Sequence, residues 1–108
     1  MTLSSKISPT AFVVLNPVAG MTNPQLLKRI IENRLHAAGW RAHFHFTAEG
    51  ENTSEIVTAE IAKGADLVIA AGGDGTIAAV AAGMVHSHIP MGIVPSGTRT
   101  SAASRQAK

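Results

Sequence analysis

The sequence contains no cysteine and no tyrosine, one tryptophan and three phenylalanines. Without cysteine, neither disulfides nor thiolate metal sites can form, which fits a reducing compartment. Because aromatic residues are so few, the apolar 45% of the chain consists mainly of Ala, Val and Ile. Small aliphatic side chains of this kind favour α/β layers, in which helices approach a sheet closely.

Charged residues are also scarce, at 15% of the chain, and the net charge is only +2. An excess this small and scattered argues against nucleic acid as a partner. No long apolar run is present, since glycines and Asp74 interrupt the most apolar stretch, residues 67–85, and this excludes a membrane span there. Residues 1–10 lack the apolar segment of a secretory signal and are expected to be a disordered lead-in to a single domain.

Apolar segments with the pattern of strands alternate along the chain with segments that have the pattern of helices. Short continuous or alternating runs predict strands at 11–15, 40–46, 67–71 and 91–94. Helical spacing predicts helices at 24–39, 52–64 and 76–85, with Asn23 and Asn52 as the N-caps of the first two. Such alternation indicates an α/β fold of three layers, with helices on both faces of a mostly parallel sheet and right-handed crossovers. The expected order is β-α-β-α-β-α-β.

Two of these segments predict which faces are buried. In the first helix, apolar residues recur at helical spacing at Leu27, Ile30, Ile31 and Leu35. The second strand alternates, with Trp40, Ala42, Phe44 and Phe46 on an apolar face and Arg41, His43 and His45 on a polar one. A strand with one polar face is expected near a sheet edge, and its two histidines are interpreted as solvated rather than as metal ligands. His86 and His88 receive the same interpretation.

Ligands of open parallel sheets bind at the carboxyl ends of the strands. That rule places three turns at one rim: residues 16–20, 72–76 and 95–98. All three are rich in Gly, Pro and small polar residues. We therefore expect the functional site at this rim.

The turn Gly72-Gly73-Asp74-Gly75-Thr76 has the composition of a phosphate-binding loop. Its glycines let backbone N–H groups face a ligand, and the following helix presents further N–H groups and a positive dipole end. Asp74 suits this setting if Mg²⁺ lies between it and a phosphate, or if it handles a proton. The alternative is a tight turn in which Asp74 and Thr76 only cap the helix. The Walker pattern and the dinucleotide fingerprint are both absent.

The same string resembles the signature of the superfamily that joins NAD kinases with diacylglycerol and sphingosine kinases, whose nucleotide-binding part is Rossmann-like. Asn16-Pro17-Val18-Ala19-Gly20 resembles the N-P-x-[SA]-G turn of the lipid-kinase branch, and Thr47 matches a family Thr before a small loop. Residues 91–98 resemble its G-[IV]-[IV]-P-x-G-T segment. The resemblance runs from about residue 12 to residue 98 and favours the lipid kinases over the NAD kinases.

The resemblance implies ATP and Mg²⁺ as cofactors and a role for each matched residue. Asn16 would lie beside the nucleotide and Thr47 near its adenosine part. The phosphates would rest on Gly72, Gly73, Asp74, Gly75 and Thr76, while Gly97 and Thr98 would close the site. Asp74 is the expected catalytic or magnesium-binding residue. The acceptor would be a lipid hydroxyl, of diacylglycerol or a sphingoid base.

The chain also departs from the family pattern. Ala78 and Ala79 replace the usual Asn and Glu after the glycine loop, and residues 99–108 read as a tail. The β-rich C-terminal domain that shapes the lipid site in the family is expected to be missing. We therefore expect residues 11–98 to form the nucleotide-binding part of a truncated kinase that is inactive by itself. The protein is expected to be cytoplasmic and to contact membranes only through the C-terminal domain. The alternatives are a non-catalytic anion- or partner-binding module and an NAD kinase relative.

Overall fold

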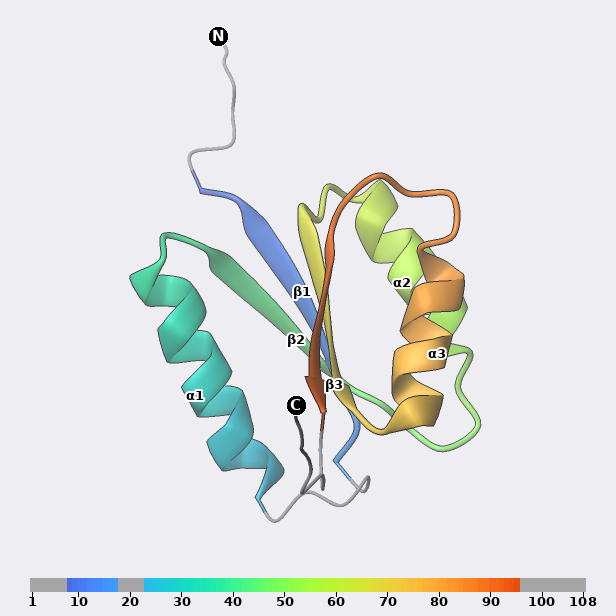
Figure 1. Cartoon of the computed structure of the whole chain (residues 1–108), viewed down its shortest axis with the longest axis horizontal. Helices are drawn as coiled ribbons and strands as arrows, with labels where there is room; N and C mark the ends of the chain where they lie inside the picture. The colour runs from blue at the N-terminus through green and yellow to red at the C-terminus, as the bar shows by residue number, and fades with distance from the viewer. Residues whose placement is uncertain (1–7, 18–22, 96–108) are drawn as a thin grey trace, which may run out of the picture.

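Strands and helices alternate throughout the computed structural model, which describes residues 8–17 and 23–95 (Figure 1). The elements are β1 (Thr10–Leu15), α1 (Pro24–Ala37), β2 (Arg41–Phe46), α2 (Thr53–Ala62), β3 (Leu67–Gly72), α3 (Asp74–Gly83) and β4 (Met91–Pro95). This is the predicted α/β order. Within the described ranges, no helix has the length and apolar character needed to cross a membrane.

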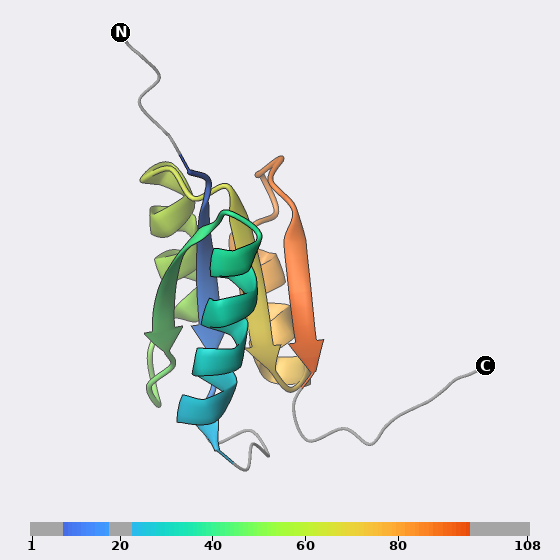
Figure 2. The ribbon, with the colours of Figure 1, turned by 90° about the vertical axis from the view of Figure 1, so that its left-hand side faces the viewer.

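The strands form one sheet in the order β2-β1-β3-β4, and every neighbouring pair is parallel. The two central strands, β1 and β3, are the continuous apolar runs, as expected for strands covered on both faces. The alternating strand β2 lies at an edge, which confirms its prediction. Figure 2 shows α1 against one face of the sheet, with α2 and α3 against the other.

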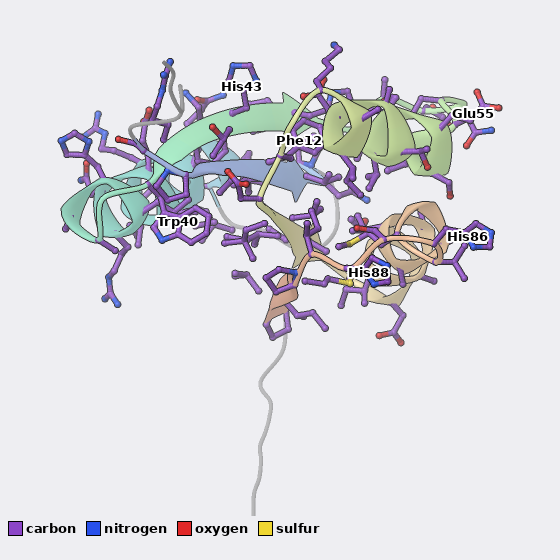
Figure 3. The ribbon with its side chains drawn as sticks, turned by 90° about the horizontal axis from the view of Figure 1, so that it is seen from above. Phe12, Trp40, His43, Glu55, His86 and His88 are labelled. Atoms are coloured by element: carbon purple, nitrogen blue, oxygen red, sulfur yellow. The ribbon has the colours of Figure 1, made fainter. Side chains whose placement is uncertain are left out.

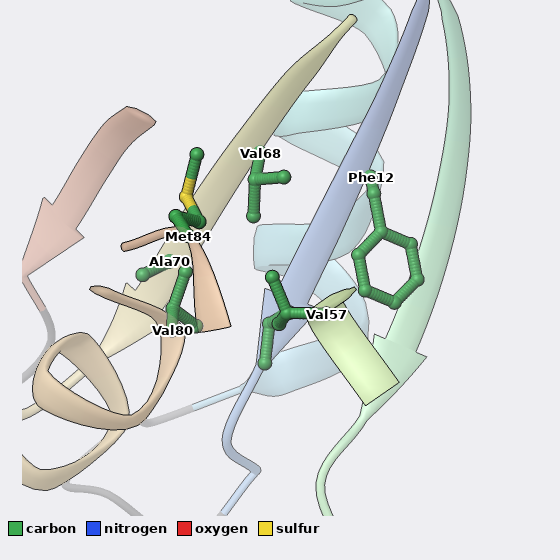
Figure 4. Close-up of a cluster of buried hydrophobic side chains, with 7 residues drawn as sticks. Phe12, Val57, Val68, Ala70, Val80 and Met84 are labelled. Atoms are coloured by element: carbon green, nitrogen blue, oxygen red, sulfur yellow. The ribbon is translucent and has the colours of Figure 1, made fainter. Parts of the chain in front are cut away.

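Each face of the sheet has its own core. Alternate residues of β1 point to opposite faces, so this strand contributes to both cores. The core beneath α2 and α3 contains Phe12, Val14, Val57, Val68, Ala70, Val80 and Met84 (Figure 4). The core beneath α1 contains Val13, Leu15, Ile31 and Ala71. A fully buried side chain such as Leu15 or Val13 stabilises the fold by roughly 1.5–3 kcal/mol.

The helix ends follow the predicted caps. The side chain of Asn23 accepts a hydrogen bond from the Leu26 N–H at 3.0 Å, and Pro24 opens α1. Asn52 accepts from the Glu55 N–H at 3.2 Å and opens α2 in the same way. Gly64 follows α2 with φ of 115°, a left-handed conformation that glycine adopts without strain.

Two helix predictions need correction. Ile30 was placed on the buried face of the first helix but is 46% exposed, because α1 meets the sheet through Leu27, Ile31 and Leu35. The third helix begins at Asp74 and ends at Gly83, whereas the sequence predicted 76–85. The glycines suggested a longer turn than exists, since Gly72 still belongs to β3 and pairs with Pro95.

Candidate functional site

The carboxyl ends of the strands bring the predicted turns to one rim of the sheet. The Asn16 N–H donates to the Ala71 carbonyl at 3.0 Å, and the Thr47 N–H donates to the Leu15 carbonyl at 3.0 Å. Asn16, Thr47 and the turn after β3 therefore lie close together, as the sequence predicted. Residues 18–20 of the first turn, and Gly97 and Thr98 of the last, fall outside the described residues.

The turn after β3 is shorter than the loop over residues 72–76 that the sequence predicted. Gly73 is its only residue between strand and helix and serves as the N-cap of α3, with φ of −89° and ψ of −167°. Its carbonyl accepts from the Ile77 N–H at 3.0 Å, which closes the first helical turn. The first N–H groups of α3 point toward the rim, together with the positive end of the helix dipole, because the helix begins there. Glycine has no side chain, so Gly73 leaves these N–H groups without a side-chain cap.

Asp74 and Thr76 both lie in the first turn of α3 but in different surroundings. Asp74 is exposed, and its carboxylate at a helix N-terminus stabilises the helix by itself. Thr76 is only 8% exposed, and its hydroxyl oxygen accepts a hydrogen bond from the Asn16 side-chain amide at 3.1 Å. Thr76 is thus inside the first turn and is not the cap that one alternative assigned to it. Its hydroxyl proton can still be donated to a ligand.

Gly72 is required by this close approach of strand and helix. A Cβ at that position would lie 2.8 Å from Thr76 Oγ1 and 2.9 Å from Thr76 Cβ. At Gly73 and Gly75, by contrast, an added Cβ would meet none of the described atoms within 4 Å. The first glycine therefore serves packing, whereas the other two leave an open approach to the backbone.

A shallow cavity of about 230 Å³ lies at the rim. Its residues come from the end of β1, from the connection between β2 and α2, and from the first turns of α3. They are Asn16, Thr47, Ala48, Glu51, Thr53, Gly75, Thr76 and Ala79. A larger hollow of about 370 Å³ lies between α2 and the end of α3 and contains none of the predicted site residues.

Glu51 also lines this cavity, although no motif in the sequence had assigned it a role. Its carboxylate accepts from the Ala48 N–H at 2.9 Å, from the Thr53 hydroxyl at 2.6 Å and from His45 Nε2 at 3.0 Å. Its position just before the helix cap Asn52 is the one local signal that could have suggested a role, since a carboxylate beside a tight connection can accept from nearby N–H groups.

The prediction for His45 also needs correction. Its side chain is only 28% exposed, and it stacks on Phe12 with ring centroids 6.2 Å apart. The prediction of a solvated face is right for His43, whose side chain is 75% exposed, and wrong for His45, because the connection to α2 folds over it. His43 lies on β2, whereas His86 and His88 both lie on the connection between α3 and β4 (Figure 3). The described part of the chain contains no group of three or more His, Cys, Asp or Glu suited to a metal.

The pKa of Glu51 lies below its usual value. Burial alone would raise this pKa, but the hydrogen bonds from Thr53, Ala48 and His45, together with the charge of His45, outweigh it. The ionised carboxylate is thus the form that the fold favours. Its contribution to stability is present above the pKa of the unfolded chain and is lost as the pH falls through the lower, folded value.

We therefore expect acid to reduce the stability of the native chain more steeply than that of Glu51→Gln, which cannot titrate at this position. Thermal unfolding midpoints between pH 6 and pH 2.5 measure the difference, because the loss begins only below the ordinary carboxylate pKa of 4.5. Glu49→Gln is the matched control, because Glu49 is exposed on the same connection and its removal should leave the curve unchanged. Parallel curves for the native chain and Glu51→Gln would contradict the assignment.

Fold and rim together define an α/β domain with a glycine turn between a central strand and a helix whose N-terminus has no side-chain cap. Residues 10–106 match the diacylglycerol kinase catalytic domain. The chain belongs to that family. This match confirms the resemblance to the lipid-kinase branch.

Individual relatives agree with the family match. An uncharacterized protein of Synechocystis sp. is 34% identical over 101 residues, covering 82% of this chain and 23% of that protein. Two Bacillus anthracis proteins provisionally assigned as diacylglycerol kinases superpose with TM-scores of 0.65, at 25% and 28% identity, each covering 88% of this chain. A further diacylglycerol kinase structure from that organism gives 0.62 at 25% identity over the same 88%. The chain spans 32–35% of those structures.

Proposed function

We propose that this chain binds ATP with Mg²⁺ at the rim and forms the nucleotide-binding part of a kinase that phosphorylates a lipid hydroxyl. The observation that carries the proposal is the glycine turn into α3, with Thr76 hydrogen-bonded to Asn16 from the neighbouring strand at 3.1 Å. Two segments that resemble the family's signature thus meet in one contact.

The residues present fit the phosphates of a nucleotide. Gly73 and Gly75 leave room for a ligand to approach the backbone, and the first N–H groups of α3 offer hydrogen bonds and a favourable dipole to an anion. The Thr76 hydroxyl adds a donor at the same place. Asn16, held by both β3 and Thr76, fixes one side of the cavity, and Thr47 lies at the other.

The residues also fit Mg²⁺, which proteins often hold through one or two carboxylates while substrate phosphates complete its coordination. Asp74 is exposed in the first turn of α3 and would supply that carboxylate. When bound, the metal would neutralise phosphate charge, which otherwise repels Asp74. The contribution of this chain is then to hold the nucleotide in place, since phosphoryl transfer depends mainly on positioning and charge.

For the acceptor we propose the hydroxyl of diacylglycerol or of a sphingoid base, as the family resemblance implies. This part of the proposal has no counterpart among the residues described, and the solved relatives are about three times as long as the matched region. We expect the 108-residue chain alone to bind nucleotide without turnover.

Millimolar Mg-ATP is expected to raise the thermal unfolding midpoint, since a ligand that binds only the folded state stabilises it by RT ln(1 + [L]/Kd). Asp74→Ala should abolish the shift, because it removes the group assigned to the metal. Differential scanning fluorimetry measures both. Glu55→Ala is the matched control, since it removes an exposed acid from the first turn of α2 and should leave the shift intact.

Absence of any shift for the native chain would refute nucleotide binding. A shift by inorganic phosphate as large as that by ATP, insensitive to Asp74→Ala, would instead favour the alternative of a non-catalytic anion-binding module. A radiolabel assay that offers NAD and diacylglycerol to a longer form of the protein would test the acceptor.

A further inference from the structure

A largely buried carboxylate, that of Glu51, lies in the wall of the cavity opposite α3. Its side chain is 13% exposed, and the family resemblance assigned it no role. Its hydrogen-bond donors come from three places: Ala48 at the start of the connection between β2 and α2, Thr53 at the start of α2, and His45 on β2. The carboxylate therefore ties both ends of this connection to the sheet.

The hydrogen-bond partners of Glu51 are fixed in place by further contacts. His45 stacks on Phe12 of the central strand β1, and the Glu51 N–H donates to the Ala48 carbonyl at 3.2 Å, which makes the connection a tight turn. A continuous set of contacts thus runs from the core through His45 and Glu51 to the turn. The position of Ala48 depends on this carboxylate, and the side of Thr47 that faces the connection is fixed with it, while the Thr47 N–H is held by the Leu15 carbonyl.

Glu51 has little capacity left for a ligand. An ionised carboxylate offers about four acceptor positions. His45 Nε2 lies 3.0 Å from each of the two oxygens, Oε1 also accepts from Ala48, and Oε2 also accepts from Thr53. A direct contact between Glu51 and an anionic nucleotide would add repulsion to an occupied group. Its role must be to place other atoms.

The residues that line the cavity indicate which atoms Glu51 places. Gly75 and Thr76 form its α3 side, where phosphates would bind, whereas Thr47, Ala48 and Thr53 form the facing wall. A nucleotide anchored by its phosphates at α3 extends toward that wall. We infer that Glu51 is a positioning residue that fixes the wall for the nucleoside part of ATP, while the phosphate side is independent of it. This inference rests on the proposed function.

The inference predicts a change in selectivity. Glu51→Gln keeps the size of the side chain but replaces one acceptor oxygen by a donor that faces the donors already present. Affinity for Mg-ATP should fall about tenfold, the effect of losing roughly one charged hydrogen bond. Affinity for inorganic tripolyphosphate with Mg²⁺ should stay unchanged. Isothermal titration of both probes against the full chain measures the two affinities.

Two further variants complete the test. Glu49→Gln makes the same chemical change at an exposed position of the connection and should alter neither affinity. His45→Phe keeps a ring to stack on Phe12 but removes the Nε2 donor, and His45 is not among the cavity-lining residues. It should weaken Mg-ATP about threefold, less than Glu51→Gln because Ala48 and Thr53 still bind the carboxylate. If Glu51→Gln fails to fold, His45→Phe carries the comparison.

Each outcome decides one question. Selective loss of Mg-ATP affinity in Glu51→Gln and His45→Phe supports the inference. Equal loss of both probes would mean that the carboxylate only maintains the fold, and unchanged Mg-ATP affinity would mean that the wall does not need it; either result overturns the inference. If the native chain binds neither probe, the proposed function itself fails and the inference falls with it.

Discussion

Gly72→Ala is expected to lower the free energy of unfolding by about 2 kcal/mol, within the range that overpacking a tight contact costs. The added methyl would lie 2.8 Å from Thr76 Oγ1 and 2.9 Å from Thr76 Cβ, and neither atom is the end of a flexible chain. Strand and helix must separate, which also breaks the hydrogen bond between Asn16 and Thr76. Urea unfolding measures the loss of stability, and titration with Mg-ATP should show no binding.

Gly73→Ala is the matched control for this variant. It adds the same methyl one residue further on, where none of the described atoms lies within 4 Å. Its free energy of unfolding should fall by only about 0.5–1 kcal/mol, the cost of alanine in place of glycine at an N-cap. Nucleotide affinity should nevertheless fall, because the methyl stands where phosphate would approach the backbone. Equal stability of Gly72→Ala and Gly73→Ala would contradict the packing role of Gly72.

Gly83→Ala should be destabilising by about 2 kcal/mol, although alanine favours helix over glycine by about 1 kcal/mol. The new Cβ would lie 2.5 Å from the Ser54 carbonyl oxygen and 2.9 Å from Val57 Cβ on the neighbouring helix. Pushing α3 away from α2 would also strain the hydrogen bond from the Thr58 hydroxyl to the Gly83 carbonyl, now 2.9 Å long. Equilibrium urea unfolding measures the effect.

Gly75→Ala is the comparison within the same helix. An added Cβ there meets none of the described atoms within 4 Å, so the intrinsic preference of alanine should appear undisturbed as a gain of up to about 1 kcal/mol. The two alanine variants of α3 are therefore expected to move stability in opposite directions. A gain in both would show that α2 and α3 can separate at no cost.

The sequence allowed the fold to be predicted wherever a local pattern determines structure. Continuous apolar runs gave the buried strands β1 and β3, alternation gave the edge strand β2, and Asn23 and Asn52 marked the starts of α1 and α2. The start of α3 was misplaced because glycine fits both a loop and a first helical turn. Only the pairing of Gly72 with Pro95 decides between them, and that pairing is tertiary.

The candidate site, too, was predictable only where local motifs determine it. Asn16, Thr47 and the residues around Gly73 were predicted from motifs, because the ends of parallel strands meet at one rim. The partnership of His45 with Glu51 was not, because it depends on how the connection folds back over β2. Alternation correctly placed His45 on the polar face, but it carries no information on what covers that face.

The contact between Asn16 and Thr76 joins positions 60 residues apart in the chain. All strand pairings among the described residues are parallel, so none of these strands pairs through a local hairpin. Contacts of such long range form slowly, because the loop between them must close first. The two sides of the rim cavity can meet only after β3 has docked beside β1 and α3 has begun. Nucleotide binding should therefore appear late in refolding, and would report completion of the sheet rather than the collapse of either core.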